Sequence, residues 1–455
     1  MNCLLLLIGL ANGTAHPTDS NSVHAAHIQA ELGAQLPAIH AIPTESAARV
    51  TSYGYLPDWL ADPLAVDLDS LSHVAWFNVS LNASGHVTDT DSWHAMANTL
   101  VASAHAVGTQ VHLTVALFDE ATQASVLSNA SHRAQAVSEL VALVNDYGAD
   151  GLNVDFEGMA REQKDDLVQF VIELKAGVDE VYLATPAVDW SGAYDYSRLS
   201  DESDGLFIMA YGYHWSGGDP GPVGPLHGGG PWSVYAQDWS LEDYRTYGAT
   251  DDKIVMGVPL YGRSWPSSSD AVPGTSTGTS SAHAMASAIA TAADYDPRFD
   301  DTSQTPWVWT GTEQLWYDDL DSTETKLSWA IDQGIQGVGY WALGYTGGDP
   351  DFWRMVDRVT RIPEPEDTGD PMDTGDPMDT DDPLDTDDPL DTGTPEDTAT
   401  PTDPGVTDAE DSGDAEEGKD DAEDKGGCGC AAGMRSPPWV WPLIVLALCT
   451  TRRRD

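Results

Sequence analysis

Apolar and polar residues follow two different patterns between residues 49 and 361. Short apolar segments of six to eight residues, rich in β-branched and aromatic side chains, predict buried strands. These segments are 51–56, 73–79, 111–117, 151–156, 181–186, 206–211, 253–260 and 337–343. Longer amphipathic segments between them predict helices, among them 132–147, 162–177, 239–248 and 323–334.

The order of these elements predicts an α/β fold with a parallel sheet. Eight strands that alternate with helices over about 310 residues are typical of a (β/α)8 TIM barrel. A doubly wound open sheet is the competing fold, but no glycine-rich phosphate loop follows the first strand. Residues 264–317 are rich in serine and threonine at 267–281 and aromatic later. They predict an elaborated loop or a small subdomain inserted before the last strand.

The first 48 residues lack this alternation. Residues 1–15 contain an apolar run, Leu4–Leu10, followed by small residues, and predict a secretory signal peptide cleaved after Ala15. No lysine or arginine precedes the run, so a misassigned start codon is the alternative. Residues 16–48 are expected to form a loose lead-in to the barrel.

Two segments of different composition follow the predicted barrel. Residues 362–427 contain an Asp/Thr/Pro hexapeptide repeat at 367–402, which predicts a disordered acidic linker because proline blocks regular structure and the acids repel one another. Residues 428–455 join a Gly-Cys-Gly-Cys element, an apolar stretch at 439–449 and an arginine cluster. The stretch is shorter than the roughly 20 residues that span a bilayer. This layout resembles the C-terminal sorting signals of myxobacterial surface proteins, which implies membrane or cell-surface attachment.

The chain is strongly acidic, with 74 Asp and Glu against 20 Lys and Arg and a formal charge of −54. Residues 1–361 carry 47 acids and 14 bases, whereas 362–427 carry 26 acids and two bases. This balance excludes nucleic acid as a partner, because phosphate binding needs clustered Lys and Arg. It also suggests that the barrel surface is adapted to high salt.

Cysteine is confined to the ends of the chain, at positions 3, 428, 430 and 449. Residues 49–361 are therefore expected to have no disulfide, thiol chemistry or cysteine-based metal site. No set of metal ligands with a recognisable spacing is evident in the sequence, and we expect neither a metal nor a cofactor.

The candidate chemistry lies in the segment Asp150–Glu157, with sequence DGLNVDFE. On a strand, Asn153, Asp155 and Glu157 share one face, and successive residues on that face are about 6.6 Å apart. Asp155 and Glu157 would therefore be neighbours at the carboxyl end of a barrel strand, where barrel active sites lie. Two adjacent carboxylates resist simultaneous ionisation, so one can act as a general acid towards a glycosidic oxygen. An ordinary solvated pair is the alternative.

These residues resemble the signature of glycoside hydrolase family 18, the family of chitinases and related N-acetylglucosaminidases. The resemblance covers most of residues 50–360 and comprises five blocks in order. They are YGYLPDW (53–59), DGLNVDFEG (150–158), MAYGYHW (209–215), GVPLYGRSW (257–265) and WYDDLDSTETKLSWAIDQGIQGVGYWALGY (316–345).

The resemblance implies a retaining, substrate-assisted hydrolysis without cofactor. Glu157 would protonate the leaving oxygen while the 2-acetamido carbonyl of the substrate attacks the anomeric carbon. Asp155 would orient the acetamido N–H, and Tyr211 would hydrogen-bond the acetamido oxygen. Trp341 would form the floor under the sugar, and Asn153 would support Asp155 in place of a commoner Asp.

One departure from the family pattern follows the sixth predicted strand. Many chitinases place Asp or Asn directly after the tyrosine there, whereas this chain has Gly212. Other candidate contacts to sugar are aromatic or basic, although packing in the barrel is an alternative for each aromatic ring and pairing with a carboxylate for the arginine. These candidates are Tyr55, Trp59, Tyr213, Trp215 and Arg263.

Together these features predict a monomeric glycosidase, secreted or held at a bacterial cell surface. Its substrate would be a β-1,4-linked N-acetylglucosamine polysaccharide, either chitin and its oligosaccharides or peptidoglycan. A non-catalytic carbohydrate-binding barrel is the alternative, but family members of that kind usually lack the acid that Glu157 represents. A surface scaffold is a third possibility.

Overall fold

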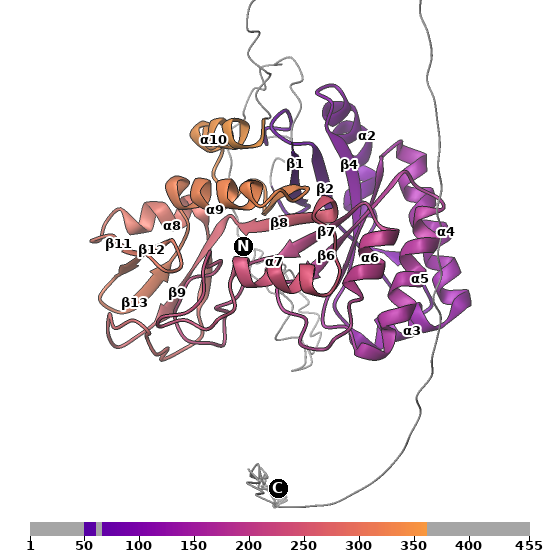
Figure 1. The fold of residues 1–455 in the computed structure, drawn as a ribbon. Helices are drawn as coiled ribbons and strands as arrows, with labels where there is room; N and C mark the ends of the chain where they lie inside the picture. The colour runs from indigo at the N-terminus through magenta and orange to yellow at the C-terminus, as the bar shows by residue number, and fades with distance from the viewer. Residues whose placement is uncertain (1–49, 61–65, 362–455) are drawn as a thin grey trace, which may run out of the picture. The chain divides into compact units, whose positions relative to one another are not determined.

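Residues 50–60 and 66–361 are described by the computed structural model. Within them, eight parallel strands close into a barrel, because β1 pairs with β2 on one side and with β14 on the other. The barrel order is β1 (Thr51–Pro57), β14 (Gly337–Trp341), β8 (Ile254–Pro259), β7 (Gly205–Met209), β6 (Glu180–Pro186), β5 (Gly151–Phe156), β4 (Gln110–Leu117) and β2 (His73–Leu81). A short β3 (Val87–Thr88) pairs antiparallel with β2. All eight predicted strands and the (β/α)8 architecture are confirmed (Figure 1).

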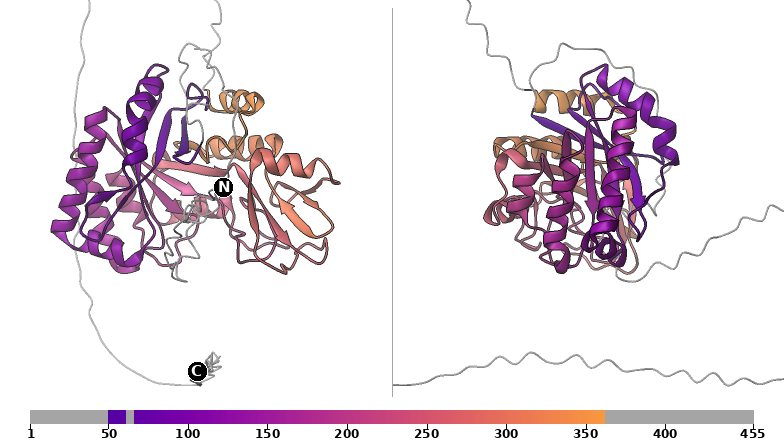
Figure 2. Two further views of the ribbon diagram at one scale, coloured as in Figure 1. Left: turned by 180° about the vertical axis from the view of Figure 1, so that it is seen from behind. Right: turned by 90° about the vertical axis from the view of Figure 1, so that its right-hand side faces the viewer.

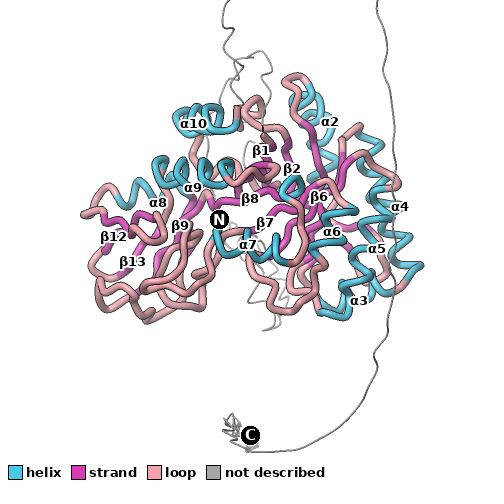
Figure 3. Tube along the Cα trace, viewed as in Figure 1, coloured by secondary structure: helices cyan, strands magenta, loops and turns pink. Residues whose placement is uncertain are grey.

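Helices surround the barrel, as Figures 2 and 3 show. Some helices begin at polar caps. The Asn129 side chain accepts hydrogen bonds from N–H groups in the first turn of the helix Ala130–Tyr147, and Asp319 and Ser322 form a capping box at the start of the helix Leu320–Asp332. Gly148 ends the helix Ala130–Tyr147 with a positive φ. The helices are α2 (Asp91–His105), α3 (Glu120–Ser128), α4 (Ala130–Tyr147), α5 (Lys164–Lys175), α6 (Tyr196–Glu202), α7 (Gln237–Thr246), α8 (Met285–Ala292), α9 (Leu320–Asp332) and α10 (Pro350–Thr360).

The predicted insertion is a separate small sheet between β8 and β14. Its five strands are all antiparallel, in the order β10 (Ser281–Ala284), β9 (Tyr261–Pro266), β13 (Glu313–Trp316), β12 (Thr305–Trp309) and β11 (Arg298–Asp300). Trp307 stacks on Trp316 with ring centroids 5.0 Å apart, and Trp232 meets Trp316 edge-on. The insertion is therefore a packed subdomain beside the barrel, rather than an elaborated loop (Figure 1).

Four of the predicted segments lie outside the described residues: the signal peptide (1–15), the lead-in (16–48), the acidic linker (362–427) and the C-terminal sorting segment (428–455). Among residues 50–60 and 66–361, no helix has the length and apolar character needed to cross a membrane.

Candidate active site

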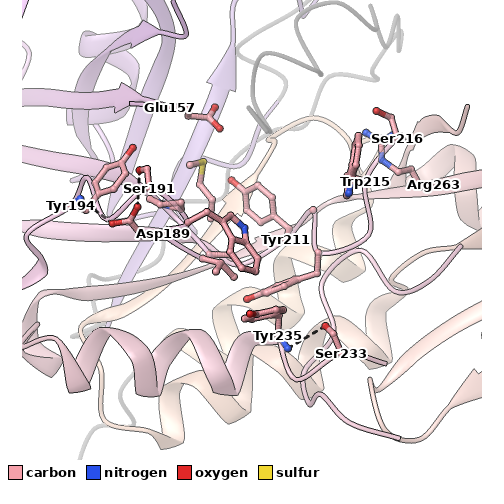
Figure 4. Close-up of a pocket in the computed structure, with 18 of the residues that line it drawn as sticks. Glu157, Asp189, Ser191, Tyr194, Tyr211, Trp215, Ser216, Ser233, Tyr235 and Arg263 are labelled. Carbon is pink, nitrogen blue, oxygen red and sulfur yellow. Dashed lines mark hydrogen bonds between the residues drawn. The ribbon is translucent and has the colours of Figure 1, made fainter. Parts of the chain in front are cut away.

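A cavity of about 380 Å³ opens at the carboxyl ends of the barrel strands. Its wall combines the residues that follow β5, β6 and β7 with the first residues of β9. Figure 4 shows Glu157, Tyr194 and Tyr211 around one part of this cavity, and Trp215 and Arg263 around another. Five of the predicted site residues belong to the wall: Glu157, Tyr211, Tyr213, Trp215 and Arg263.

The backbone around Glu157 is held by three hydrogen bonds from neighbouring elements. The Glu157 N–H donates to Leu117 O at 3.2 Å, and Glu157 O accepts from Gln123 Nε2 at 2.7 Å. The Tyr194 hydroxyl donates to Phe156 O. Gln123, on α3, also donates to Leu117 O at 2.6 Å, so one buried amide joins the ends of β4 and β5. The carboxyl group therefore projects from a fixed point.

Asn153 and Asp155 occupy alternate positions of β5, so they share one face of the strand, and Glu157 is the first residue after it. Asn153 and Asp155 are both fully buried. Burial raises the pKa of Asp155 well above its usual range. The Tyr55 hydroxyl donates to Asn153 Oδ1 at 3.2 Å, which links β1 to β5 beneath the cavity.

Tyr211 follows β7 and is buried beside both carboxylates. Burial raises its pKa well above the usual value, and the charges of Tyr261, Asp155 and Glu157 add to the effect. Tyr211 therefore keeps its proton at neutral pH and is able to donate a hydrogen bond into the cavity.

The other predicted contacts in the wall have their own supports. The Tyr213 hydroxyl lies 2.7 Å from Ser240 Oγ, and Trp215 is 44 % exposed. Arg263 is buried, and its Nη1 donates to Ser280 Oγ at 2.8 Å. Within residues 50–60 and 66–361, Arg263 forms no ion pair with a carboxylate.

Tyr55 and Trp341 are both fully buried at the carboxyl ends of β1 and β14. Their ring centroids are 5.5 Å apart, and Phe77 lies 4.9 Å from Trp341. Trp59 meets Trp341 at 6.4 Å. These rings form an aromatic group under the barrel mouth, outside the cavity wall described above. Contact of Trp341, Tyr55 and Trp59 with sugar stays a prediction.

Gly212 lines the cavity and has a φ of 76°. This left-handed conformation suits glycine, and among other residues Asn and Asp adopt it most readily. The backbone at this point therefore accommodates both the glycine of this chain and the Asp or Asn common in the resembling family.

Sequence reasoning missed the loop after β6. Asp189 accepts hydrogen bonds from the backbone N–H groups of Gly192, Ala193 and Tyr194, which fixes the loop around the cavity. Trp190 lines the cavity, is 69 % exposed and meets Tyr235 edge-on at 4.9 Å. The available signal was an acid and a tryptophan three and four residues after the end of a predicted barrel strand.

Residues 51–346 match the profile of "Glycosyl hydrolases family 18". The chain belongs to glycosyl hydrolase family 18. Two similar proteins are the cortical fragment-lytic enzyme of Bacillus anthracis, 27 % identical over 250 residues, and Chitinase C of Streptomyces lividans, 25 % identical over 240 residues. The matches cover 51 % and 47 % of this chain but only 54 % and 38 % of those proteins. Family membership and these relatives place the chain among the glycoside hydrolases.

Solved structures agree with this assignment at the level of the fold. The Group IV chitinase of Ostrinia furnacalis in complex with allosamidin has a TM-score of 0.62 at 17 % identity, covering 68 % of this chain and 98 % of that one. The family 18 chitinase of Cycas revoluta in complex with (GlcNAc)3 has a TM-score of 0.61 at 18 % identity, covering 68 % and 99 %.

Proposed function

We propose that this glycosidase cleaves β-1,4-linked N-acetylglucosamine glycans (chitin, chitooligosaccharides or peptidoglycan) by a retaining, substrate-assisted mechanism. The observation that carries the proposal is that Glu157 lines the cavity two residues after the buried Asp155, and that the charges of both carboxylates act on the buried Tyr211. The names of the relatives, a chitinase and a cortical fragment-lytic enzyme, keep both substrate classes open.

In the proposed reaction, Glu157 donates its proton to the glycosidic oxygen as the bond to the anomeric carbon breaks. The carbonyl oxygen of the substrate's own 2-acetamido group forms the new bond to that carbon, giving an oxazolinium intermediate. Water then attacks the same carbon and gives its proton to Glu157, which restores the acid. Two inversions leave the anomeric configuration unchanged.

Asp155 and Tyr211 would hold the acetamido group in the attacking position. The Tyr211 hydroxyl, which keeps its proton, donates to the acetamido oxygen, and Asp155 accepts the acetamido N–H. Since burial favours the neutral form of Asp155, the positive charge that develops on the oxazolinium ring would in turn favour its carboxylate. The preorganised backbone at Glu157 keeps the acid in line with the leaving oxygen.

The aromatic wall suits a sugar polymer. Trp190 and Trp215 are 69 % and 44 % exposed, and large flat rings pack well against the apolar faces of pyranose units. We infer that these two rings, with Tyr213 and Arg263, bind sugars on either side of the cleaved bond. We expect Asn153, which accepts a hydrogen bond from Tyr55, to support Asp155 from below.

We also propose that the protein is a secreted or surface-attached monomer. The support is in the sequence alone: the apolar run at 4–10, the acidic repeat at 367–402 and the Cys, apolar and Arg elements of 428–455. Amino-terminal sequencing of the protein from its native cells tests export, with a mature start at His16 as the expected result.

The activity is tested by the purified full-length chain on N-acetylglucosamine oligomers and on purified peptidoglycan, with reducing ends as the readout. Glu157→Gln should abolish their release from whichever glycan the wild type cleaves. Glu162→Gln, at an exposed glutamate near the site, is the matched control and should be fully active. Binding of oligomers without reducing ends from either glycan would identify a carbohydrate-binding protein instead.

A further inference from the structure

Two histidines and a glutamate meet at the amino-terminal end of the barrel, opposite the end that carries Glu157. His73 is the first residue of β2, His112 lies early in β4, and Glu180 is the first residue of β6. Glu180 Oε2 lies 3.0 Å from His73 Nε2 and 3.1 Å from His112 Nε2. All three atoms lie within 4.8 Å of one another.

A second layer of polar groups orients these three side chains. Ser72 Oγ lies 2.7 Å from His73 Nδ1, and the Tyr53 hydroxyl lies 3.1 Å from His112 Nδ1. Gln110 Nε2 donates to the other carboxylate oxygen, Glu180 Oε1, at 3.0 Å. Partners of this kind on the far side of ligating histidines and carboxylates are typical of metal sites, where they fix the ring orientation.

We propose that His73, His112 and Glu180 bind one divalent transition-metal ion through Nε2, Nε2 and Oε2, with Zn²⁺ as the ion that this ligand set fits. Tetrahedral Zn²⁺ with ligands at about 2.0 to 2.1 Å keeps neighbouring ligand atoms about 3.3 Å apart, close to the 3.0 and 3.1 Å observed here. Water completes the fourth position.

Binding requires each imidazole to carry its proton on Nδ1. That N–H then donates to the hydroxyl oxygen of Ser72 or Tyr53, and Nε2 presents a lone pair to the ion. The ion would replace the two hydrogen bonds to Glu180 and connect β2, β4 and β6 across the bottom of the barrel. Its role is to stabilise the barrel, since the cluster is at the end away from Glu157.

The test strips the full-length protein with EDTA and titrates it with Zn²⁺ by calorimetry, and with Co²⁺ by visible absorption. The wild type should bind one more equivalent of metal ion per chain than His112→Gln. The unfolding temperature of the wild type should also rise when Zn²⁺ is added. The acidic linker and the cysteines at 428 and 430 remain in every variant, so their own binding cancels in the comparison.

Further variants keep the test decisive if His112→Gln does not fold. Glu180→Gln, at the more exposed ligand, should also lose the extra equivalent, and Tyr53→Phe should weaken binding about 10- to 100-fold. His105→Gln, in an exposed His–Asp pair, should bind like the wild type. If the stripped wild type binds no more Zn²⁺ or Co²⁺ than Glu180→Gln, the cluster is a hydrogen-bond network only and the proposal is overturned.

Discussion

The buried amide of Gln123 is expected to position the catalytic acid. Gln123→Met keeps the length and volume of the side chain but removes both hydrogen bonds of Nε2, to Leu117 O at 2.6 Å and to Glu157 O at 2.7 Å. Leu117 O still accepts from the Glu157 N–H at 3.2 Å. Because Gln123 is fully buried, water does not replace the lost donors.

The cost of this change has two parts. Losing a buried hydrogen-bond donor costs about 1 to 3 kcal/mol per acceptor affected, so with two acceptors stability should fall by about 2 to 6 kcal/mol. The carboxyl end of β5 also gains freedom, and a shift of about 1 Å in a catalytic group costs on the order of 10²-fold in rate. We therefore expect kcat to fall 10- to 100-fold while KM changes little, since no sugar-binding ring moves.

Gln314→Met is the matched control. Gln314 is also fully buried, and its Nε2 also donates to two backbone carbonyls, Ser269 O at 3.1 Å and Ala271 O at 2.9 Å. It lies in the inserted sheet and outside the cavity wall. Gln314 Oε1 also accepts from Trp316 Nε1 at 3.1 Å, so denaturant unfolding should show at least as large a loss of stability in Gln314→Met as in Gln123→Met. Steady-state kinetics on N-acetylglucosamine oligomers should show kcat lowered only in Gln123→Met. Equal kcat values in the two variants would refute the positioning role.

Three further results are expected. Burial raises the pKa of Asp155, so stability is lost as the pH rises through the folded-state pKa of this carboxyl group. Asp155→Asn should therefore unfold at a higher temperature than the wild type at pH 8, with the difference in unfolding temperature vanishing towards pH 4, while kcat falls. A difference that stays the same from pH 4 to pH 8 would contradict this role of burial. Trp190→Ala should raise KM about 5- to 30-fold, the equivalent of about 1 to 2 kcal/mol, with kcat retained, and an unaltered KM would exclude sugar contact. Raising NaCl from about 0.1 M to about 1 M shortens the screening length from about 10 to 3 Å, so the unfolding temperature of this acidic protein should rise. An unfolding temperature that does not rise with salt would exclude adaptation to high salt.

Much of the barrel could be predicted from sequence because its strands are buried on both sides. A strand such as β5, buried at all six positions, leaves a continuous apolar segment with polar residues only where chemistry needs them. For the same reason, the alternation of Asn153, Asp155 and Glu157 located the carboxylates on one face. The inserted sheet was less predictable, since its short strands carry few apolar residues and its packing depends on tryptophans distant in sequence.

The rest of the site has no local pattern. Asp189, Trp190 and Tyr235 belong to loops whose course is set by hydrogen bonds formed only after folding. Gln123 is an ordinary helix residue until α3 brings it against the end of β5. The ligands of the proposed metal site are separated by 68 and 107 residues from Glu180, so only closure of the barrel brings them together.

The stereochemical course of cleavage tests whether hydrolysis is substrate-assisted with Glu157 as the acid. Proton NMR can follow the anomeric signals during the first minutes of hydrolysis of an N-acetylglucosamine oligomer. It distinguishes an initial β-anomer from an initial α-anomer before mutarotation mixes them. The β-anomer is the expected initial product, because the acetamido group and then water each attack the anomeric carbon once. An initial α-anomer would contradict a substrate-assisted reaction with Glu157 as its acid.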